Sequence, residues 1–132
     1  MVKVIAFLKC KEGLSRAAFI DYYENKHVPL ILSIAPQIID YRRNFLVGED
    51  LLRGSTDPIL GSSAAARDFD VITEICFADE TTFAAAMSAF TEPDNFAAIA
   101  ADEENIFDRS KHRFYRVDAR GSKGLVSTKF GG

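Results

Sequence analysis

His27 is the residue whose type and position best fit chemistry. Phe19, Tyr23 and His27 stand four residues apart, so they form one row on a single face of a predicted helix. An imidazole on this face can take or give a proton near neutral pH, with a nearby tyrosine as a second donor. A structural alternative stays open. Pro29 should end or kink the helix, and His27 could then cap a free carbonyl at that end.

Tyrosines are the next candidates. Tyr22 and Tyr23 are adjacent and point about 100° apart on a helix, so only one shares the face of His27 well, and the spacing favours Tyr23. Each could equally be a core residue with its hydroxyl at an edge. We predict that His27 and Tyr23 are catalytic. The predicted substrate-binding residues are Phe7, Phe19, Tyr41 and Asn44.

Arg43 and Asn44 alternate on a predicted strand, so one of them faces the helices and the other faces away. Either could orient a carbonyl oxygen of a ligand. A charged pair with Asp40 or Glu74 is the favoured use of these side chains.

The second histidine, His112, lies in a polar and basic stretch, residues 109–113, and we predict that it is solvated. The two histidines lack metal-ligand spacing and no Cys, Asp or Glu cluster joins them, so no metal is predicted. No glycine-rich phosphate loop and no Gly-x-Ser-x-Gly elbow occurs in the sequence. With these motifs absent from the sequence, the remaining functions are chemistry without a cofactor or plain ligand binding.

Four segments have the alternation or the branched and aromatic content of strands: residues 2–10, 37–47, 69–78 and 113–117. Helices are predicted over residues 16–27, 80–90 and 93–101, the first with Ser15 and the second with Asp79 as its N-cap. Residues 30–34 can add a further helical piece. Residues 48–67 are rich in Gly, Pro, Ser and Thr and are predicted to form a loop. The glycine-rich residues 121–132 are predicted to form a C-terminal extension, with one domain over residues 1–120.

The resulting order, β-α-β-β-α-(α)-β, is that of an α+β ferredoxin-like fold, with helices on one face of a four-stranded antiparallel sheet. The strand over residues 2–10 has apolar centres on both faces, with Val4 and Ala6 on one and Ile5 and Phe7 on the other. A single helical layer covers only one face. The bare face therefore predicts a homodimer that pairs two sheets.

Composition sets the remaining limits. The chain has 132 residues, 48% hydrophobic and 27% charged, which fits one globular domain. A net charge of −3 argues against nucleic-acid binding.

No apolar run reaches the roughly 20 residues of a membrane helix, and the N-terminus lacks the features of a signal peptide. Cys10 and Cys76 are predicted to be reduced core residues, which points to the cytoplasm. Eleven Phe and no Trp suit either a packed core or a pocket for a flat ligand.

The sequence resembles the EthD family of dimeric α/β-barrel proteins. The resemblance covers roughly residues 1–118 and rests on residues 14–16, 19, 22–24 and 27–30, on the strand segments 41–44 and 70–78, and on residues 102–104 and 107–108. It implies the ferredoxin-like fold and a homodimer. EthD proteins are associated with an ether-degrading cytochrome P450 system. Similar dimeric barrels act as polyketide cyclases, dehydratases or decarboxylases without a metal or an organic cofactor.

Two functions are therefore expected, and one plainer alternative. The first is proton transfer on a small hydrophobic or aromatic, polyketide-like metabolite, with His27 as acid or base. The second is non-catalytic ligand binding as an accessory protein of an oxygenase or ether-degradation pathway. In the plainer alternative, side chains fill the barrel and leave no pocket.

Overall fold

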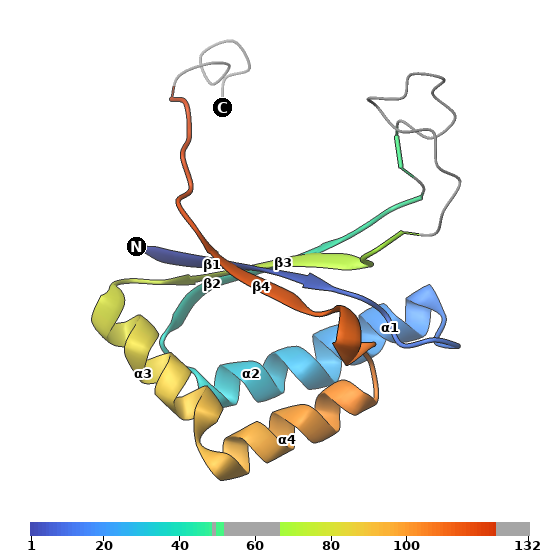
Figure 1. Cartoon of the computed structure of the whole chain (residues 1–132), viewed down its shortest axis with the longest axis horizontal. Helices are drawn as coiled ribbons and strands as arrows, with labels where there is room; N and C mark the ends of the chain where they lie inside the picture. Colours follow the sequence, from blue (N-terminus) through green and yellow to red (C-terminus); the bar gives the residue numbers. More distant parts are fainter. Residues whose placement is uncertain (49, 52–66, 124–132) are drawn as a thin grey trace.

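A computed structural model describes residues 1–48, 50–51 and 67–123 of the chain (Figure 1). The elements follow in the order β1 (Val2–Leu8), α1 (Arg16–Tyr22), the π-helical turn η1 (Tyr23–His27), α2 (Val28–Ile34), β2 (Ile38–Phe45), β3 (Val71–Phe77), α3 (Glu80–Thr91), α4 (Pro93–Glu104), the 3-10 turn η2 (Arg109–Lys111) and β4 (Arg113–Val117). The predicted loop 48–67 and the extension 121–132 lie mostly outside the described residues.

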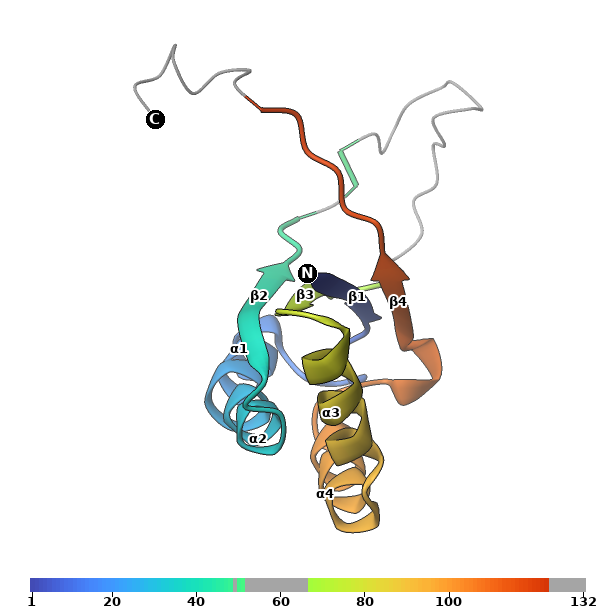
Figure 2. The same ribbon diagram turned by 90° about the vertical axis from the view of Figure 1, so that its left-hand side faces the viewer.

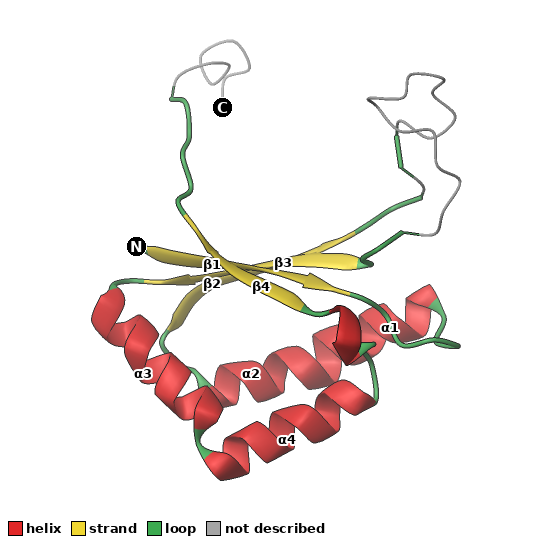
Figure 3. Cartoon of the chain, in the orientation of Figure 1, coloured by secondary structure: helices red, strands yellow, loops and turns green. Residues whose placement is uncertain are grey.

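The sheet has the strand order β2-β3-β1-β4, and every neighbouring pair is antiparallel. All helices lie on one face of this sheet (Figures 1 and 3). Seen from the end, α1 and α2 run beneath β2, whereas α3 and α4 run beneath the middle of the sheet (Figure 2). The α+β ferredoxin-like fold predicted from the sequence is confirmed.

Alternation along the strands decides which side chains meet the helices. Val2, Ala6 and Leu8 of β1 are buried on the helical side, and the register places Ala6 opposite Thr73 of β3. Phe7 pairs with Ile72 and points to the other face. The sheet therefore presents one face to the helices, and no helix or strand of the described residues covers the other face (Figure 2).

Short polar motifs fix where the helices begin. The Ser15 hydroxyl accepts a hydrogen bond from the Ala18 amide at 3.1 Å, as predicted for an N-cap. Asp79 and Thr82 form a reciprocal capping box at the start of α3. α4 ends at Glu104, three residues later than predicted. The last three residues are acidic, so they do not extend the apolar spacing from which the end of the helix was predicted.

The helix does not end at Pro29, and the further helical piece predicted over residues 30–34 is present within α2, with Pro29 in its first turn. The helix continues from Arg16 to Ile34, and one wide π turn, η1, takes up the irregularity. The Val28 amide donates to the carbonyl of Tyr23, five residues earlier, and Pro29 lies in the first turn of α2, where a missing donor costs little. His27 makes no capping bond with its side chain, so the capping alternative is wrong.

Arg43 differs from its predicted use. Its guanidinium forms a two-pronged pair with Glu24 of η1, at 2.8 and 3.0 Å, because it lies on the helical face of β2. On the opposite face Asn44 bonds Glu74 at 3.1 Å. Cys10 and Cys76 form no disulfide, and Cys76 is buried as predicted, whereas Cys10 is only half-buried. Within the described ranges, no helix has the length and apolar character that crossing a membrane requires.

Candidate functional site

A cavity of about 830 Å³ lies between the sheet and the helices. Its floor is the helical face of β1 and β3, and its apolar wall is formed by Phe83, Met87, Phe90, Phe96 and Ile99 of α3 and α4. Its polar residues include His27, Glu103, Arg109, Ser110 and His112. A mostly apolar pocket with a few convergent polar groups is typical of a small-molecule site. The plainer alternative, a barrel filled by side chains, is therefore wrong.

His27 lies in the π turn and is only 5% exposed. Its Nδ1 is 2.6 Å from Oδ2 of Asp102 on α4. The Tyr22 hydroxyl donates to the other oxygen of Asp102 at 2.8 Å, and Asn105 in turn donates to Tyr22 at 3.0 Å. A chain of hydrogen bonds therefore fixes Asp102, which fixes the imidazole. No side chain of the described residues bonds Nε2, the second ring nitrogen of His27.

Burial lowers the pKa of His27 below its usual 6.5, although the bond and the charge of Asp102 act in the opposite direction. The imidazole is therefore neutral at pH 7. In the neutral form the nitrogen next to Asp102 carries the proton, because a carboxylate can only accept. Nε2 then holds a free lone pair in a residue that lines the cavity. This arrangement can act as a general base.

Tyr23 and Tyr41 also line the cavity. The Tyr23 ring packs against His27 with ring centres 5.1 Å apart, and its hydroxyl shares a hydrogen bond of 2.6 Å with Thr73. Burial raises the pKa of Tyr23 to about 12 and raises the pKa of Tyr41 further. Both hydroxyls therefore stay protonated near neutral pH. The Tyr23 hydroxyl is engaged with Thr73, whereas the Tyr41 hydroxyl can offer a hydrogen bond to a ligand oxygen. Neither hydroxyl ionises near pH 7, so neither can act as a base.

The other predicted substrate-binding residues lie elsewhere. Phe19 is buried behind the cavity wall, where its ring packs edge-on against Tyr23 and Phe107. Phe7 and Asn44 lie on the uncovered face of the sheet, because their positions alternate with those that face the helices. The structure thus brings together His27, Tyr23 and Tyr41, and it separates Phe7 and Asn44 from them.

The prediction that His112 is solvated is wrong. Its side chain is 10% exposed and lines the same cavity as His27. Burial and the charge of Arg109 lower its pKa to about 4, so it is neutral at pH 7. Its Nε2 is buried without a hydrogen-bond partner among the described residues. The ring of Phe107 stands against both histidines, with centres 5.3 Å from His27 and 4.9 Å from His112.

Asp102 and Glu103 were missed as site residues, because they stand 75 and 76 positions after His27 in the sequence. The sequence signal available was the acidic run 102–104, which was noted only as part of the family resemblance. Nowhere in the described part of the chain do three or more His, Cys, Asp or Glu side chains gather as they would to hold a metal ion.

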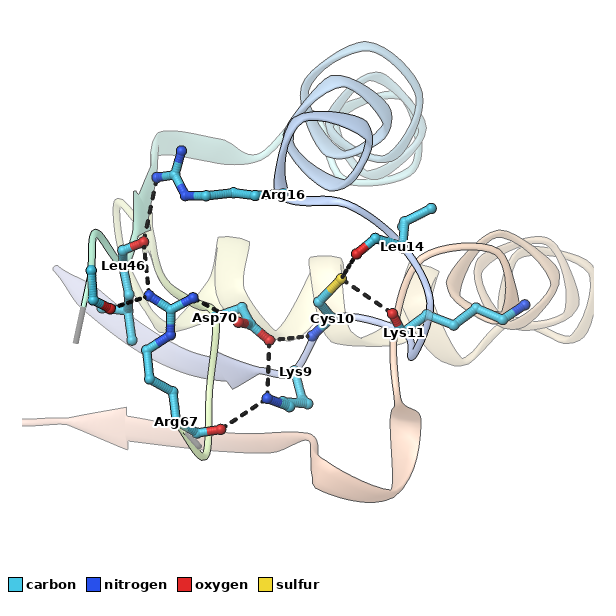
Figure 4. Close-up of polar contacts among 9 residues, drawn as sticks. Lys9, Cys10, Lys11, Leu14, Arg16, Leu46, Arg67 and Asp70 are labelled. Carbon is cyan, nitrogen blue, oxygen red and sulfur yellow. Dashed lines mark hydrogen bonds and ion pairs between the residues drawn. The ribbon is translucent and has the colours of Figure 1, made fainter. Parts of the chain in front are cut away.

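A second polar cluster lies beyond the end of β1 (Figure 4). Asp70 accepts a hydrogen bond from the Cys10 amide at 2.8 Å and pairs with Lys9 at 3.5 Å. Lys9 also donates to the carbonyl of Arg67 at 2.8 Å, and Arg67 and Arg16 donate to carbonyls just after β2. These cations are committed to backbone oxygens and to Asp70. The cluster is therefore structural: it ties together the segments that follow β1 and β2.

Comparison with known proteins adds a family and a fold. A family model described as the EthD domain matches residues 11–110. No curated protein matches the sequence. The solved structure of an EthD family protein from Bacillus halodurans has 22% identity and a TM-score of 0.57, covering 91% of this chain and 99% of that one. An EthD-like protein from Ralstonia eutropha has 20% identity and a TM-score of 0.54, with 93% and 96% covered.

A third solved structure comes from a protein with a described activity. SnoaB, a cofactor-independent oxygenase from Streptomyces nogalater, has 12% identity and a TM-score of 0.52, with 92% of this chain and 95% of that chain covered. At these identities the structural likenesses establish the fold and not the reaction.

Proposed function

This chain belongs to the EthD family, and from that membership we propose that it binds a small apolar or aromatic metabolite and moves protons on it without a cofactor. The observation that carries the proposal is the His27–Asp102 pair, buried at 2.6 Å in the wall of the 830 Å³ cavity. Cyclisation, dehydration and decarboxylation of a polyketide-like compound all need such proton transfers. SnoaB supports the idea that this fold hosts chemistry without a cofactor.

In this mechanism the apolar wall of α3 and α4 holds the ring system of the ligand and excludes water. His27 takes a proton from a carbon or hydroxyl of the ligand through Nε2. Asp102 stabilises the imidazolium that forms, because its carboxylate already accepts the Nδ1 proton. Tyr41 can hydrogen-bond an oxygen of the ligand, since its hydroxyl stays protonated.

A carrier without catalysis is the second candidate, favoured by the predominance of Phe, Met and Ile side chains in the lining. As an accessory protein of an oxygenase or ether-degradation pathway, it would sequester or deliver a hydrophobic compound. Affinity for the ligand would then depend on the apolar wall, and replacement of His27 would leave function intact.

Asp102→Asn separates the two candidates. Loss of a charge-assisted hydrogen bond is worth about 1.5–3 kcal/mol, so we expect the variant to be roughly ten- to a hundredfold slower as a base catalyst. The assay follows hydrogen–deuterium exchange next to the carbonyl of 2-tetralone, an aromatic ketone, by proton NMR in D₂O. This readout needs only a base near the carbon acid and no knowledge of the natural substrate.

Asp21→Asn is the matched control, because Asp21 carries a similar carboxylate that accepts a hydrogen bond from Asn25 on the exposed side of the helix, away from the cavity. It should exchange the probe at the rate of the unaltered protein. Equal rates for Asp102→Asn and the unaltered protein, with 2-tetralone bound by both, would favour the carrier and overturn the catalytic proposal.

We further propose that two copies pair through the uncovered sheet face. This face carries Phe7, which packs against Phe69, and Tyr115, which is 55% exposed. Phe7→Glu should convert a particle of two chains into one of a single chain, measured as molar mass by light scattering, because it places an unpaired charge in the interface. Leu32→Glu, on the exposed side of α2, is the control that should keep the mass. A single-chain mass for the unaltered protein would contradict the pairing.

The functional unit that we propose spans residues 1–120, with residues 121–132 as an extension. The last described strand, β4, ends at Val117. Free Cys10 and Cys76 are consistent with a reducing compartment, and we propose the cytoplasm as the place of action.

A further inference from the structure

Two consecutive carboxylates, Asp102 and Glu103, end α4 in opposite environments. Asp102 accepts hydrogen bonds from Tyr22 and His27. The Glu103 carboxylate accepts none from the part of the chain that the structure describes. It lines the same cavity as His27, and its side chain is only 13% exposed. A carboxyl group without hydrogen bonds in an apolar cavity favours its neutral form.

The groups that face Glu103 come from α4, from η2 and from His112, which lies between η2 and β4. Arg109 of η2 has its Nε 3.5 Å from Oε1, and His112 has its Nδ1 3.8 Å from Oε2. Asp102 and Glu104 lie beside it on α4 and add negative charge. Burial outweighs Arg109 and raises the pKa of Glu103 to about 7, and the two acidic neighbours act in the same direction as burial. His112 is neutral at pH 7 and leaves this balance unchanged.

We propose that Glu103 is a second catalytic residue, the proton donor that works together with His27 as the proton acceptor in the same cavity. The inference rests on the proposed function and specifies it further. Both residues line the cavity, and burial keeps the His27 imidazole neutral and the Glu103 carboxyl protonated, so one pocket holds a proton acceptor and a proton donor. Asp102 positions the base, His27, and the next residue in the sequence, Glu103, is the acid.

The step balances with the residues present. His27 Nε2 takes the proton from the carbon next to a ligand carbonyl, and the electrons of that C–H bond form the new carbon–carbon double bond. The π electrons of the carbonyl move to its oxygen, which takes the proton of the Glu103 carboxyl. The product is an enol, with His27 as imidazolium and Glu103 as carboxylate. Reversal of both transfers resets the pair. In a dehydration the proton of Glu103 goes instead to a hydroxyl on the carbon adjacent to the deprotonated one: the C–H electrons form a double bond between these two carbons, the C–O bond breaks with its electrons on oxygen, and water leaves. Solvent then carries the proton from the imidazolium back to the carboxylate.

The test compares Glu103→Gln with the unaltered protein in the 2-tetralone exchange assay across pH 5–9. Gln keeps the size of the side chain and can donate a hydrogen bond, but it cannot give up a proton. We expect a rate about 10²-fold lower at pH 6.5. The unaltered protein should lose activity above about pH 7, as Glu103 ionises, and Glu103→Gln should lack this alkaline decline.

Stability provides a readout without a substrate. In the folded protein Glu103 keeps its proton up to about pH 7, whereas the unfolded chain releases it near the ordinary value of 4.5. The folded state thus binds more protons in this window, and stability falls as pH rises from about 4.5 to 7. Glu103→Gln should show a smaller fall in the urea midpoint over the same range.

Glu12→Gln is the control of the same residue type, because Glu12 is exposed, precedes α1 and lies outside the cavity lining. It should leave the rate, the alkaline decline and the stability profile unchanged. Glu103→Gln with an unaltered rate and alkaline decline, alongside a slow Asp102→Asn, overturns the role of Glu103 and leaves the function of His27 intact. Normal rates in both variants, or no exchange by the unaltered protein, overturn both proposals.

Discussion

Replacement of His27 by asparagine should slow exchange of 2-tetralone by roughly 10²–10⁴-fold, the usual contribution of a general base. The asparagine amide can still donate to Asp102, so the buried carboxylate keeps a partner in place of the 2.6 Å bond to Nδ1. It has no nitrogen lone pair that can take a proton. The variant therefore removes the base and preserves the local polar balance, and initial rates by proton NMR measure the loss.

Lys26→Ala serves as the control for this prediction, because Lys26 lies in the same π turn but on its exposed side. It should exchange the probe at the normal rate. His27→Gln provides a second replacement in case the asparagine variant unfolds in urea earlier than the unaltered protein. A folded His27 variant that keeps its rate would show that the histidine only supports the helix packing.

The pH dependence of the unaltered protein should reflect His27 as well. The pKa of His27 lies below 6.5 because burial disfavours the imidazolium. Activity should therefore fall in acid, as pH drops through the lowered pKa of His27, since the protonated ring cannot accept a second proton. With the alkaline decline of Glu103 at about pH 7, the profile has its maximum between these two values.

Much of the fold could be predicted because strand alternation and caps are local. The period of two in residues 71–77 and the branched, apolar run of residues 2–8 identified the central strands, but apolar centres on both faces left open which face meets the helices. Asp79 marked the start of α3 in the sequence because its side chain bonds within its own turn. Pro29 alone could not decide whether the helix ends or continues, since a proline in the first turn of a helix and one that breaks a helix look alike locally.

The site was only half predictable. The four-residue spacing of Tyr23 and His27 brought their rings together correctly, because it is a property of one helix. The Asp102 partner comes from another helix, and spacing within one helix holds no information about it. Phe7 was assigned to the ligand on its type alone, although alternation with Ala6 already placed it on the opposite face. The burial of His112 could not be predicted, because its neighbours in the sequence are polar and basic, and its contact with Phe107 arises only in the fold.

Phe107→Ala should lower the free energy of unfolding by about 3–5 kcal/mol, the usual cost of removing a buried ring from a packed core. Phe107 is 4% exposed. Its ring packs edge-on against four others, those of Phe19, Tyr23, His27 and His112, at centre distances of 4.9–5.8 Å. Removal of the Phe107 ring therefore takes away a packing contact that both histidines share with Phe19 and Tyr23. Urea unfolding followed by circular dichroism measures the change.

Phe114→Ala is the control of the same residue type, because Phe114 also lines the cavity and contacts His112 but is 57% exposed. It should change stability by about 0.5 kcal/mol or less, as exposed substitutions usually do. A loss in Phe107→Ala no larger than in Phe114→Ala would mean that the ring cluster does not support the cavity wall. The expected difference would instead establish that the pocket and the core share one packed unit, so the position of the base depends on the stability of the fold.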